Sequence, residues 1–121
     1  MNRVRCFDEQ IVTDNSTYVT VSAMVRFHFS PLISLSMIKK LKNCYKFIEH
    51  GEKEGTYVFF TMSGTSKCNK DTFNLEFGTR LARDRMVKGA RNTVYAMLLK
   101  LAYELDSIAD VLEDNALEVR R

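Results

Sequence analysis

The segment from Thr17 to Phe29 constrains the fold of this chain more than any other, because apolar and polar side chains alternate along its whole length. Successive side chains of a β-strand point to opposite faces, so the alternation predicts one long strand with an apolar face and a more polar face. The apolar set is Val19, Val21, Ala23, Val25, Phe27 and Phe29, and the other set is Tyr18, Thr20, Ser22, Met24, Arg26 and His28. Such a strand is typical of an antiparallel sheet that is covered on one side only.

A shorter strand pattern precedes this segment. Residues 2 to 7 alternate charged and apolar side chains, which predicts a strand with Arg3 and Arg5 on its open face. Asp14 and Asn15 then favour a turn before the long strand begins.

A hairpin is predicted after the long strand. Residues 44 to 62 are rich in aromatic and β-branched side chains on both sides of the loop 51 to 55, which favours a hairpin, although its first arm could instead continue a preceding helix. On the second arm, the more apolar face holds Val58, Phe60 and Met62, and the other face holds Tyr57, Phe59 and Thr61.

Two helices are predicted from capping residues that precede apolar side chains at helical spacing. Ser30 and Pro31 supply an N-cap and a first helical residue, and Asp71 supplies the N-cap of a longer helix. The apolar positions that follow are Ile33, Met37, Leu41 and Cys44 in the first helix, and Phe73, Phe77 and Leu81 in the second. Each set predicts a helix face that packs against the core.

The C-terminal part is predicted as separate helices. Residues 89 to 92 indicate a break with Asn92 as a new cap, and Ser107 and Asp110 resemble a capping box for a last helix over residues 108–112, before a frayed tail. Between these signals, apolar side chains recur at spacings of four and three residues, which is typical of a seam between helices and predicts self-association. These side chains are Val94, Leu98, Leu101 and Leu105.

Together these patterns predict a single α+β domain over residues 1–121, with mainly strands and one helix in residues 1–65 and helices in residues 71–114. The expected architecture is an antiparallel β-sheet with helices packed on one face and further C-terminal helices. A chain of 121 residues, of which 45% are apolar, can bury one core but not two. The open sheet face or the helical seam would then form a homo-oligomer.

Composition excludes several classes of protein. The three cysteines are an odd number without metal-like spacing, which indicates a reducing cytosol. The net charge of +3 is small and the basic and acidic residues are interleaved, which disfavours long-range attraction to nucleic acid. The sequence has no apolar run of membrane-spanning length and no N-terminal signal pattern, so we expect a soluble intracellular protein.

The sequence contains no motif for catalysis or metal binding. His28 and His50 lie at no ligand spacing from each other or from the cysteines, so no metal is expected. Cys68 has no nearby histidine in the sequence, although folding could bring His28 to it. Acid pairs such as Asp106 and Asp110 are typical of a solvated helix face. We therefore expect a protein that is not an enzyme and has no cofactor.

A polar loop and the helix after it form the candidate binding region. The loop from Gly64 to Asn69 offers hydrogen-bonding side chains but lacks the glycine spacing of a phosphate-binding loop. On the helix, small residues accompany Arg85, so this arginine is either a buried structural charge or an anion hook. The small residues are Gly78, Ala82 and Gly89.

Side chains from other segments could complete such a site. Phe59 could stack on a base, and Arg5, Arg83 and Arg85 could neutralise phosphates. The alternative interpretation is that Phe59 belongs to the core and that Arg83 pairs with Asp84 or with solvent.

The same region resembles a pattern found in small phage proteins. The run from Gly64 to Asn69 is followed by Asp71-Thr72-Phe73-Asn74, then by Gly78, by Leu81-Ala82 and by Arg85. In this pattern the chain is similar to the Thoeris anti-defence family of phage nucleotide sponges, in its first-described type. The likeness covers residues 64–85 in residue detail and the rest in length and element order, and residues 30–55 have no counterpart in it.

The resemblance implies a function and a set of binding residues. Such sponges bind a cyclic ADP-ribose-type immune signal in the host cytoplasm and sequester it without cleavage, at an interface within a homodimer or higher homo-oligomer. Carried onto this sequence, Phe59 and Asn69 would hold the adenine and ribose side, and Arg85 and Arg5 would hold the diphosphate. Phe60 competes with Phe59 for the stacking role, and Phe59 is preferred because it lies on the face with more polar side chains.

Two other functions stay open at this level. A sheet with one helical face and nearby arginines also describes small RNA-binding modules, although the weak net charge counts against nucleic acid. The chain could also be a protein that inhibits a host enzyme, through the exposed sheet edge or the C-terminal seam.

Overall fold

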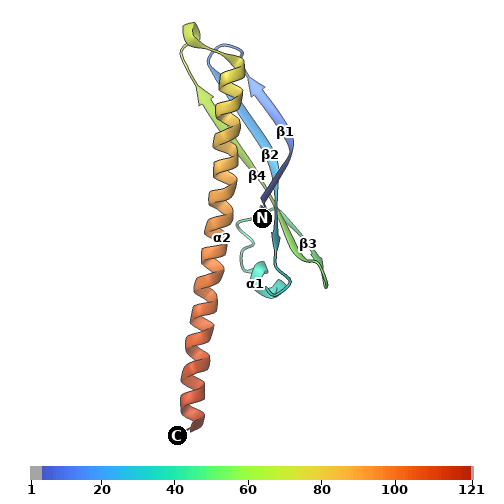
Figure 1. Cartoon of the computed structure of the whole chain (residues 1–121), viewed down its shortest axis with the longest axis vertical. Coiled ribbons are helices and arrows are strands. Elements are labelled where there is room, and N and C mark those ends of the chain that lie inside the picture. Colours follow the sequence, from blue (N-terminus) through green and yellow to red (C-terminus); the bar gives the residue numbers. More distant parts are fainter. Residues whose placement is uncertain (1–3, 121) are drawn as a thin grey trace.

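The computed structural model describes residues 4–120 and consists of one antiparallel sheet and one long helix (Figure 1). The elements are β1 (Val4–Thr13), β2 (Tyr18–Phe29), α1 (Leu35–Lys39), β3 (Phe47–Gly51), β4 (Gly55–Lys67), the 3-10 helix η1 (Lys70–Thr72) and α2 (Leu75–Arg120). The strand order across the sheet is β1-β2-β4-β3. The predicted α+β class with an antiparallel sheet is confirmed.

Strand β2 forms the centre of the core, as its alternation predicts. Every second residue from Val19 to Phe29 is buried, and the residues between them are only partly buried. The N-terminal half of α2 covers the buried face, so the opposite face of the sheet is left without a helix (Figure 1). We call this uncovered side the open face.

Strand β1 is longer than predicted and is irregular in the middle. It pairs with β2 over its whole length, with a shift in register between Phe7 and Gln10, where Asp8 has a φ of 53°. Arg5 is exposed and pairs with Arg26 of β2, as expected for a residue on the open face. The prediction for Arg3 lies outside the described residues.

The predicted hairpin is confirmed, with β3 and β4 as its two arms. Val58 and Phe60 are buried on the helix-covered side, and Phe59 lies on the open face because its register partner is Arg26. Strand β3 is much shorter than β4, so residues 60–67 of β4 have a β-strand partner on one side only.

Helix α1 begins later than predicted. The Ser34 hydroxyl, and not that of Ser30, accepts a hydrogen bond from Met37 N at 3.3 Å and caps the helix before Leu35. Ile38 is buried in the core from this helix. The other predicted apolar positions also contact the core, with Leu41 buried and Ile33, Met37 and Cys44 partly buried.

The predicted breaks in the C-terminal part are wrong, because α2 is one continuous helix from Leu75 to Arg120. Its N-cap is Asn74, whose side chain accepts a hydrogen bond from Phe77 N at 3.0 Å, whereas the predicted cap Asp71 lies in η1. The glycine expected to end a helix, Gly89, instead lies where the helix packs against Met62 of β4. The signals at residues 92, 107 and 110 lie inside the helix, and the predicted tail is helical as far as residue 120.

The face of α2 that packs on the sheet is also different from the predicted one. Phe77 is exposed, and Phe73 and Leu81 are only partly buried. The buried residues are Gly78, Ala82, Met86, Ala90, Val94, Met97 and Leu101. The small residues predicted to admit a ligand face the sheet instead: the Ala82 carbonyl lies against Gly64 of β4, and side chains added at Gly78 and Gly89 would meet those of Val19 and Met62.

This contact is closest at Gly64 of β4. A Cβ added there would overlap the Ala82 carbonyl oxygen and the Met86 nitrogen of α2, and would lie 3.0 Å from the carbonyl carbon of Arg85. Backbone atoms in a helix cannot move aside one at a time, so the contact requires glycine.

We predict that Gly64→Ala destabilises the protein by about 1–3 kcal/mol, because overpacking forces the helix away from the sheet. Gly89→Ala is the matched control. Its added Cβ would meet the flexible Met62 side chain at 3.0 Å from Sδ, and alanine favours a helix interior by about 1 kcal/mol. Chemical denaturation of both variants checks this, and equal losses of stability would contradict the close-packing assignment.

The turn between β1 and β2 depends on Asp14. Its carboxylate accepts hydrogen bonds from the backbone nitrogens of Ser16 at 2.9 Å, Thr17 at 2.7 Å and Tyr18 at 3.1 Å, and from the Thr17 hydroxyl. These bonds hold the pKa of the Asp14 carboxyl far below its ordinary value of 3.8. The bond from the Thr17 hydroxyl is the largest cause, and the backbone bonds follow.

We predict a pH-dependent contribution from this turn. A depressed carboxyl pKa stabilises the fold at pH values above the ordinary pKa, and this stabilisation is lost progressively as the pH falls below about 4. Asp14→Asn should therefore lower the melting temperature at neutral pH, and the difference from the natural protein should shrink in acid. A difference that is constant with pH would contradict this role for the charge.

Candidate functional site

The candidate site is a row of four side chains that crosses the open face of the sheet. In register, Arg5 of β1 is opposite Arg26 of β2, Arg26 is opposite Phe59 of β4, and Phe59 is opposite Phe47 of β3. Directly opposed residues have Cβ atoms about 5 Å apart, so the four side chains form one continuous strip. We call this strip the Arg–Phe row.

The aromatic end of the Arg–Phe row is a stacked pair. The rings of Phe47 and Phe59 lie 4.5 Å apart between centroids with an interplanar angle of 15°, and Phe7 meets Phe59 edge-on at 6.4 Å. Phe59 is therefore only 7% exposed, although no helix covers it, whereas Phe47 is 45% exposed at the edge of the sheet. The surface available to a flat ligand at this end is Phe47.

The arginine end of the row holds two guanidinium groups without an ion-pair partner among the described residues. Within residues 4–120, no carboxylate lies within 4 Å of the guanidinium of Arg5 or Arg26. Arg26 instead lies over the ring of Tyr57, 4.9 Å from its centroid, and Tyr57 stacks on His28 at 4.4 Å. Like charges directly opposed across strands are destabilising, so this pair is unfavourable unless an anion joins it.

Arg83 and Arg85, two other predicted site residues, lie on α2 at different edges of the sheet. Arg83 forms a bidentate ion pair with Glu9 of β1, with Nε to Oε1 at 2.6 Å and Nη2 to Oε2 at 2.9 Å. The Arg83 hydrogen bond holds the pKa of Glu9 below its usual range. Arg85 donates from Nη1 to the Thr65 carbonyl oxygen at 2.7 Å and so caps an unpaired group of β4.

Asn69 is separated from the row within one protomer. It is exposed between β4 and η1, and its side chain makes no capping hydrogen bond. Phe59 and the end of the same strand at Lys67 are eight residues apart, which corresponds to about 26 Å. The structure thus brings together Arg5 and Phe59 of the predicted site residues, and it does not bring Asn69, Arg83 or Arg85 to them.

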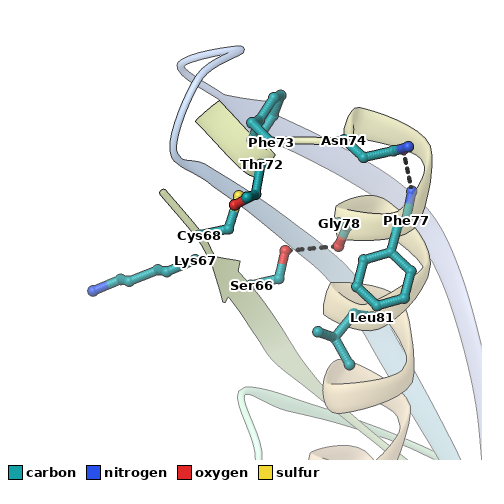
Figure 2. A pocket seen from close by; sticks show the side chains of 9 residues that line it. All are labelled: Ser66, Lys67, Cys68, Thr72, Phe73, Asn74, Phe77, Gly78 and Leu81. Atoms are coloured by element: carbon teal, nitrogen blue, oxygen red, sulfur yellow. Dashed lines mark hydrogen bonds between the residues drawn. The ribbon is translucent and has the colours of Figure 1, made fainter. Parts of the chain in front are cut away.

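Apart from the row, a hollow lies where β4 and η1 meet the start of α2 (Figure 2). Its volume is about 270 Å³, and its lining residues include Cys68, Phe73, Phe77 and Leu81. The Ser66 hydroxyl donates to the Gly78 carbonyl oxygen at 2.8 Å, and Lys67 points away from the hollow in Figure 2. Ser66 is thus engaged in holding α2 to β4 and Asn74 in capping α2, and the hollow has a mainly apolar wall.

The candidate nucleophiles and metal ligands are spread over the structure, with Cys68 and His28 at opposite ends of the sheet. Burial raises the pKa of the Cys6 thiol despite the opposing charge of Arg91, which lowers the fraction of reactive thiolate. Cys68 lies in the hollow beyond the end of β4, whereas His28 lies at the other end of β2, bonded to the Glu54 carbonyl oxygen. Within residues 4–120, no group of three histidine, cysteine or acidic side chains is placed to hold a metal ion.

No family model, curated protein or solved structure matches this chain significantly. Of the helices in residues 4–120, none combines the length and the apolar character needed to cross a membrane.

Sequence patterns do not identify Arg26, Phe47 and Phe7 as neighbours of Arg5 and Phe59. The alternation puts Arg26 on the more polar face of the long strand, but nothing in the sequence identifies its cross-strand neighbours. Phe47 and Phe7 lie in segments whose strand register depends on the bulge in β1 and on the length of β3. The alternation of residues 17–29, which puts Arg26 on the more polar face, is the only sequence signal for any of these three residues.

We predict that the two stacked phenylalanines differ sharply in their effect on stability. Phe59→Ala should destabilise the fold by about 3 kcal/mol, because it removes a nearly buried ring, and Phe47→Ala should cost much less. Urea denaturation of both variants measures this difference. If Phe47→Ala proves as costly as Phe59→Ala, Phe47 is a core residue and not an available surface.

Proposed function

We propose that the Arg–Phe row binds an anionic nucleotide-type ligand and sequesters it without cleavage. The observation that carries this proposal is the juxtaposition of a stacked aromatic pair with two arginines that have no carboxylate partner in residues 4–120, all on an uncovered sheet face. In the proposed complex, the base stacks on the exposed ring of Phe47, and the phosphates lie between Arg5 and Arg26.

The chemistry of each end matches one part of a nucleotide. Stacking of a base on an aromatic side chain contributes about 1–3 kcal/mol and tolerates any base. Guanidinium groups form bidentate hydrogen bonds with phosphate oxygens, and two such groups about 5 Å apart at their Cβ atoms can share one diphosphate. An anion bound there would also remove the repulsion between Arg5 and Arg26.

The row favours binding over catalysis. Its four side chains include no carboxylate, thiol or imidazole that could serve as a general base or nucleophile. The nearest imidazole, that of His28, stacks on Tyr57 and is bonded through Nε2 to the Glu54 carbonyl oxygen. A protein of this kind acts by lowering the concentration of free ligand.

In its specific form, the proposal follows the resemblance at residues 64–85. The chain would be a phage anti-defence protein that sequesters a cyclic ADP-ribose-type immune signal in the host cytoplasm, as a homodimer or higher homo-oligomer. Phe59 would support the stacking ring of Phe47, and Arg5 would act together with Arg26. Asn69 and Arg85 would reach the ligand only from another protomer, because of their distance from the row.

Single-stranded RNA is the second candidate ligand. Exposed aromatic and arginine side chains on an uncovered sheet are also the arrangement that stacks successive unpaired bases. The two candidates differ in their response to salt, since each phosphate contact of a polyanion releases counterions and steepens the salt dependence.

We predict that isothermal titration calorimetry with cyclic ADP-ribose as the probe shows one binding site, and that its affinity depends on the Arg–Phe row. Arg26→Ala and Arg5→Ala should each weaken binding at least about tenfold through loss of a charge-assisted contact. Phe47→Ala should weaken it by about 1–3 kcal/mol. Arg91→Ala, which removes an exposed arginine of α2, is the matched control and should leave the affinity unchanged.

The fate of the ligand completes this test. Mass spectrometry after heat release should detect the intact cyclic probe. Detection of a linear product would instead show that the protein hydrolyses the ligand. Tight binding of an oligoribonucleotide, with a steep loss of affinity in salt and no binding of the cyclic probe, would establish the RNA alternative. If Arg26→Ala and Arg91→Ala weaken binding of the probe equally, the Arg–Phe row is not the binding site.

A further inference from the structure

The second half of α2 extends beyond the rest of the protein. The last residue of the helix that is buried is Leu101, and the helix continues to Arg120, which adds about 28 Å at 1.5 Å per residue. Figure 1 shows this segment projecting away from the sheet. We call residues 102–120 the projecting segment.

The projecting segment carries an apolar stripe that the rest of its own chain does not cover. The stripe continues the one that packs on the sheet, at spacings of four and three residues. Its members are Leu105, Ile108, Leu112 and Val119, with Asn115 at the intervening position. Leu112 is 62% exposed, and the other apolar members are exposed as well. An isolated amphipathic segment of this length is marginal in water, so the stripe requires a cover.

We propose that the cover is a second copy of the same chain, with the two projecting segments paired antiparallel as a short coiled coil. The spacing is that of the a and d positions of a coiled coil, which is complementary to itself. Alanines at a seven-residue interval flank the stripe on one side and allow close approach of the paired backbones. They are Ala102, Ala109 and Ala116.

Charge selects a second copy over a membrane or a nucleic acid. The projecting segment carries six acidic side chains and one arginine, and the acids are Glu104, Asp106, Asp110, Glu113, Asp114 and Glu118. Amphipathic helices that bind anionic membranes are rich in lysine and arginine on the polar face, which is the opposite arrangement. A phosphate backbone would be repelled for the same reason.

Charge also selects the antiparallel orientation. The segment around α1 is rich in lysine, with Lys39, Lys40, Lys42 and Lys46. Lys40 pairs with Glu104 of its own chain at 3.2 Å, which places the lysine-rich segment beside the start of the projecting segment. With Ile108 of one copy opposite Leu112 of the other, Glu118 of each helix lies beside residue 102 of the other copy, next to its lysine-rich segment. Parallel pairing would instead keep both acidic tips away from the lysine-rich segments, which lie beside the start of each projecting segment.

The helix dipole favours the same arrangement. Acidic side chains near a helix C-terminus lie at the negative end of the macrodipole, which is unfavourable in an isolated helix. An antiparallel neighbour and the partner's lysines both offset this cost. The inference holds whether or not the Arg–Phe row binds a nucleotide, because it concerns a different part of the chain.

Sedimentation equilibrium of the full chain at micromolar concentrations tests the pairing. The natural protein should be a dimer, and Ile108→Glu, which puts a charge at the centre of the stripe, should raise the dimer dissociation constant at least about tenfold. Leu117→Glu is the matched control, because Leu117 is 54% exposed on the opposite side of the helix, and it should leave the dimer intact. A monomeric natural protein, or equal behaviour of the two variants, would overturn the proposal.

Charge reversal tests the orientation. The double variant Lys39→Glu and Lys42→Glu avoids the lysine that is engaged with Glu104, and it should weaken the dimer and remove most of its sensitivity to salt. Since these side chains are exposed, circular dichroism should show an unchanged fold. A dimer that is unaffected by the double variant would overturn the antiparallel arrangement.

Discussion

The close approach of α2 to β4 is the constraint on which the rest of this structure depends. Because Gly64 has no side chain, the backbone of α2 passes directly over the strand, and Ala82 lies at this crossing. A helix held so tightly against one face covers that face along most of the length of β4. With no second long helix in residues 4–120, the other face keeps its side chains accessible, and this asymmetry creates the candidate site.

The open face combines a stabilising contact between aromatic rings with a destabilising contact between two arginines. Phe59 is almost buried by its aromatic neighbours, as a core residue would be. Arg5 and Arg26 nevertheless lie side by side in the same row, with no carboxylate of residues 4–120 within 4 Å. Cross-strand repulsion of this kind costs a few tenths of a kcal/mol to about 1 kcal/mol, which is small beside the burial of a phenylalanine. The aromatic pair can therefore hold the charges in place for an anion.

Local signals predicted the sheet well and the long helix badly. The alternation from Val19 to Phe29 specifies a half-buried strand because strand period and burial coincide. Gly89 and Asn92 carry the local signature of a helix end, but packing against β4 explains the glycine and the helix continues through both residues. The Arg–Phe row was beyond prediction for a different reason, since it exists only once four strands have taken their register, and no residue of one strand identifies its neighbour in the next.

Ligand binding at the Arg–Phe row and dimerisation through the projecting segment are separable, because α2 and the row lie on opposite faces of the sheet. Pairing through the projecting segment leaves Phe47 and Arg26 accessible in both copies, so a ligand on the row adds no contact across that interface. By thermodynamic linkage, such a ligand cannot change the dimer dissociation constant, whereas a ligand held between protomers must tighten the dimer. Contribution of Asn69 or Arg85 to the same ligand would therefore require a second interface, at the far end of β4 from the row.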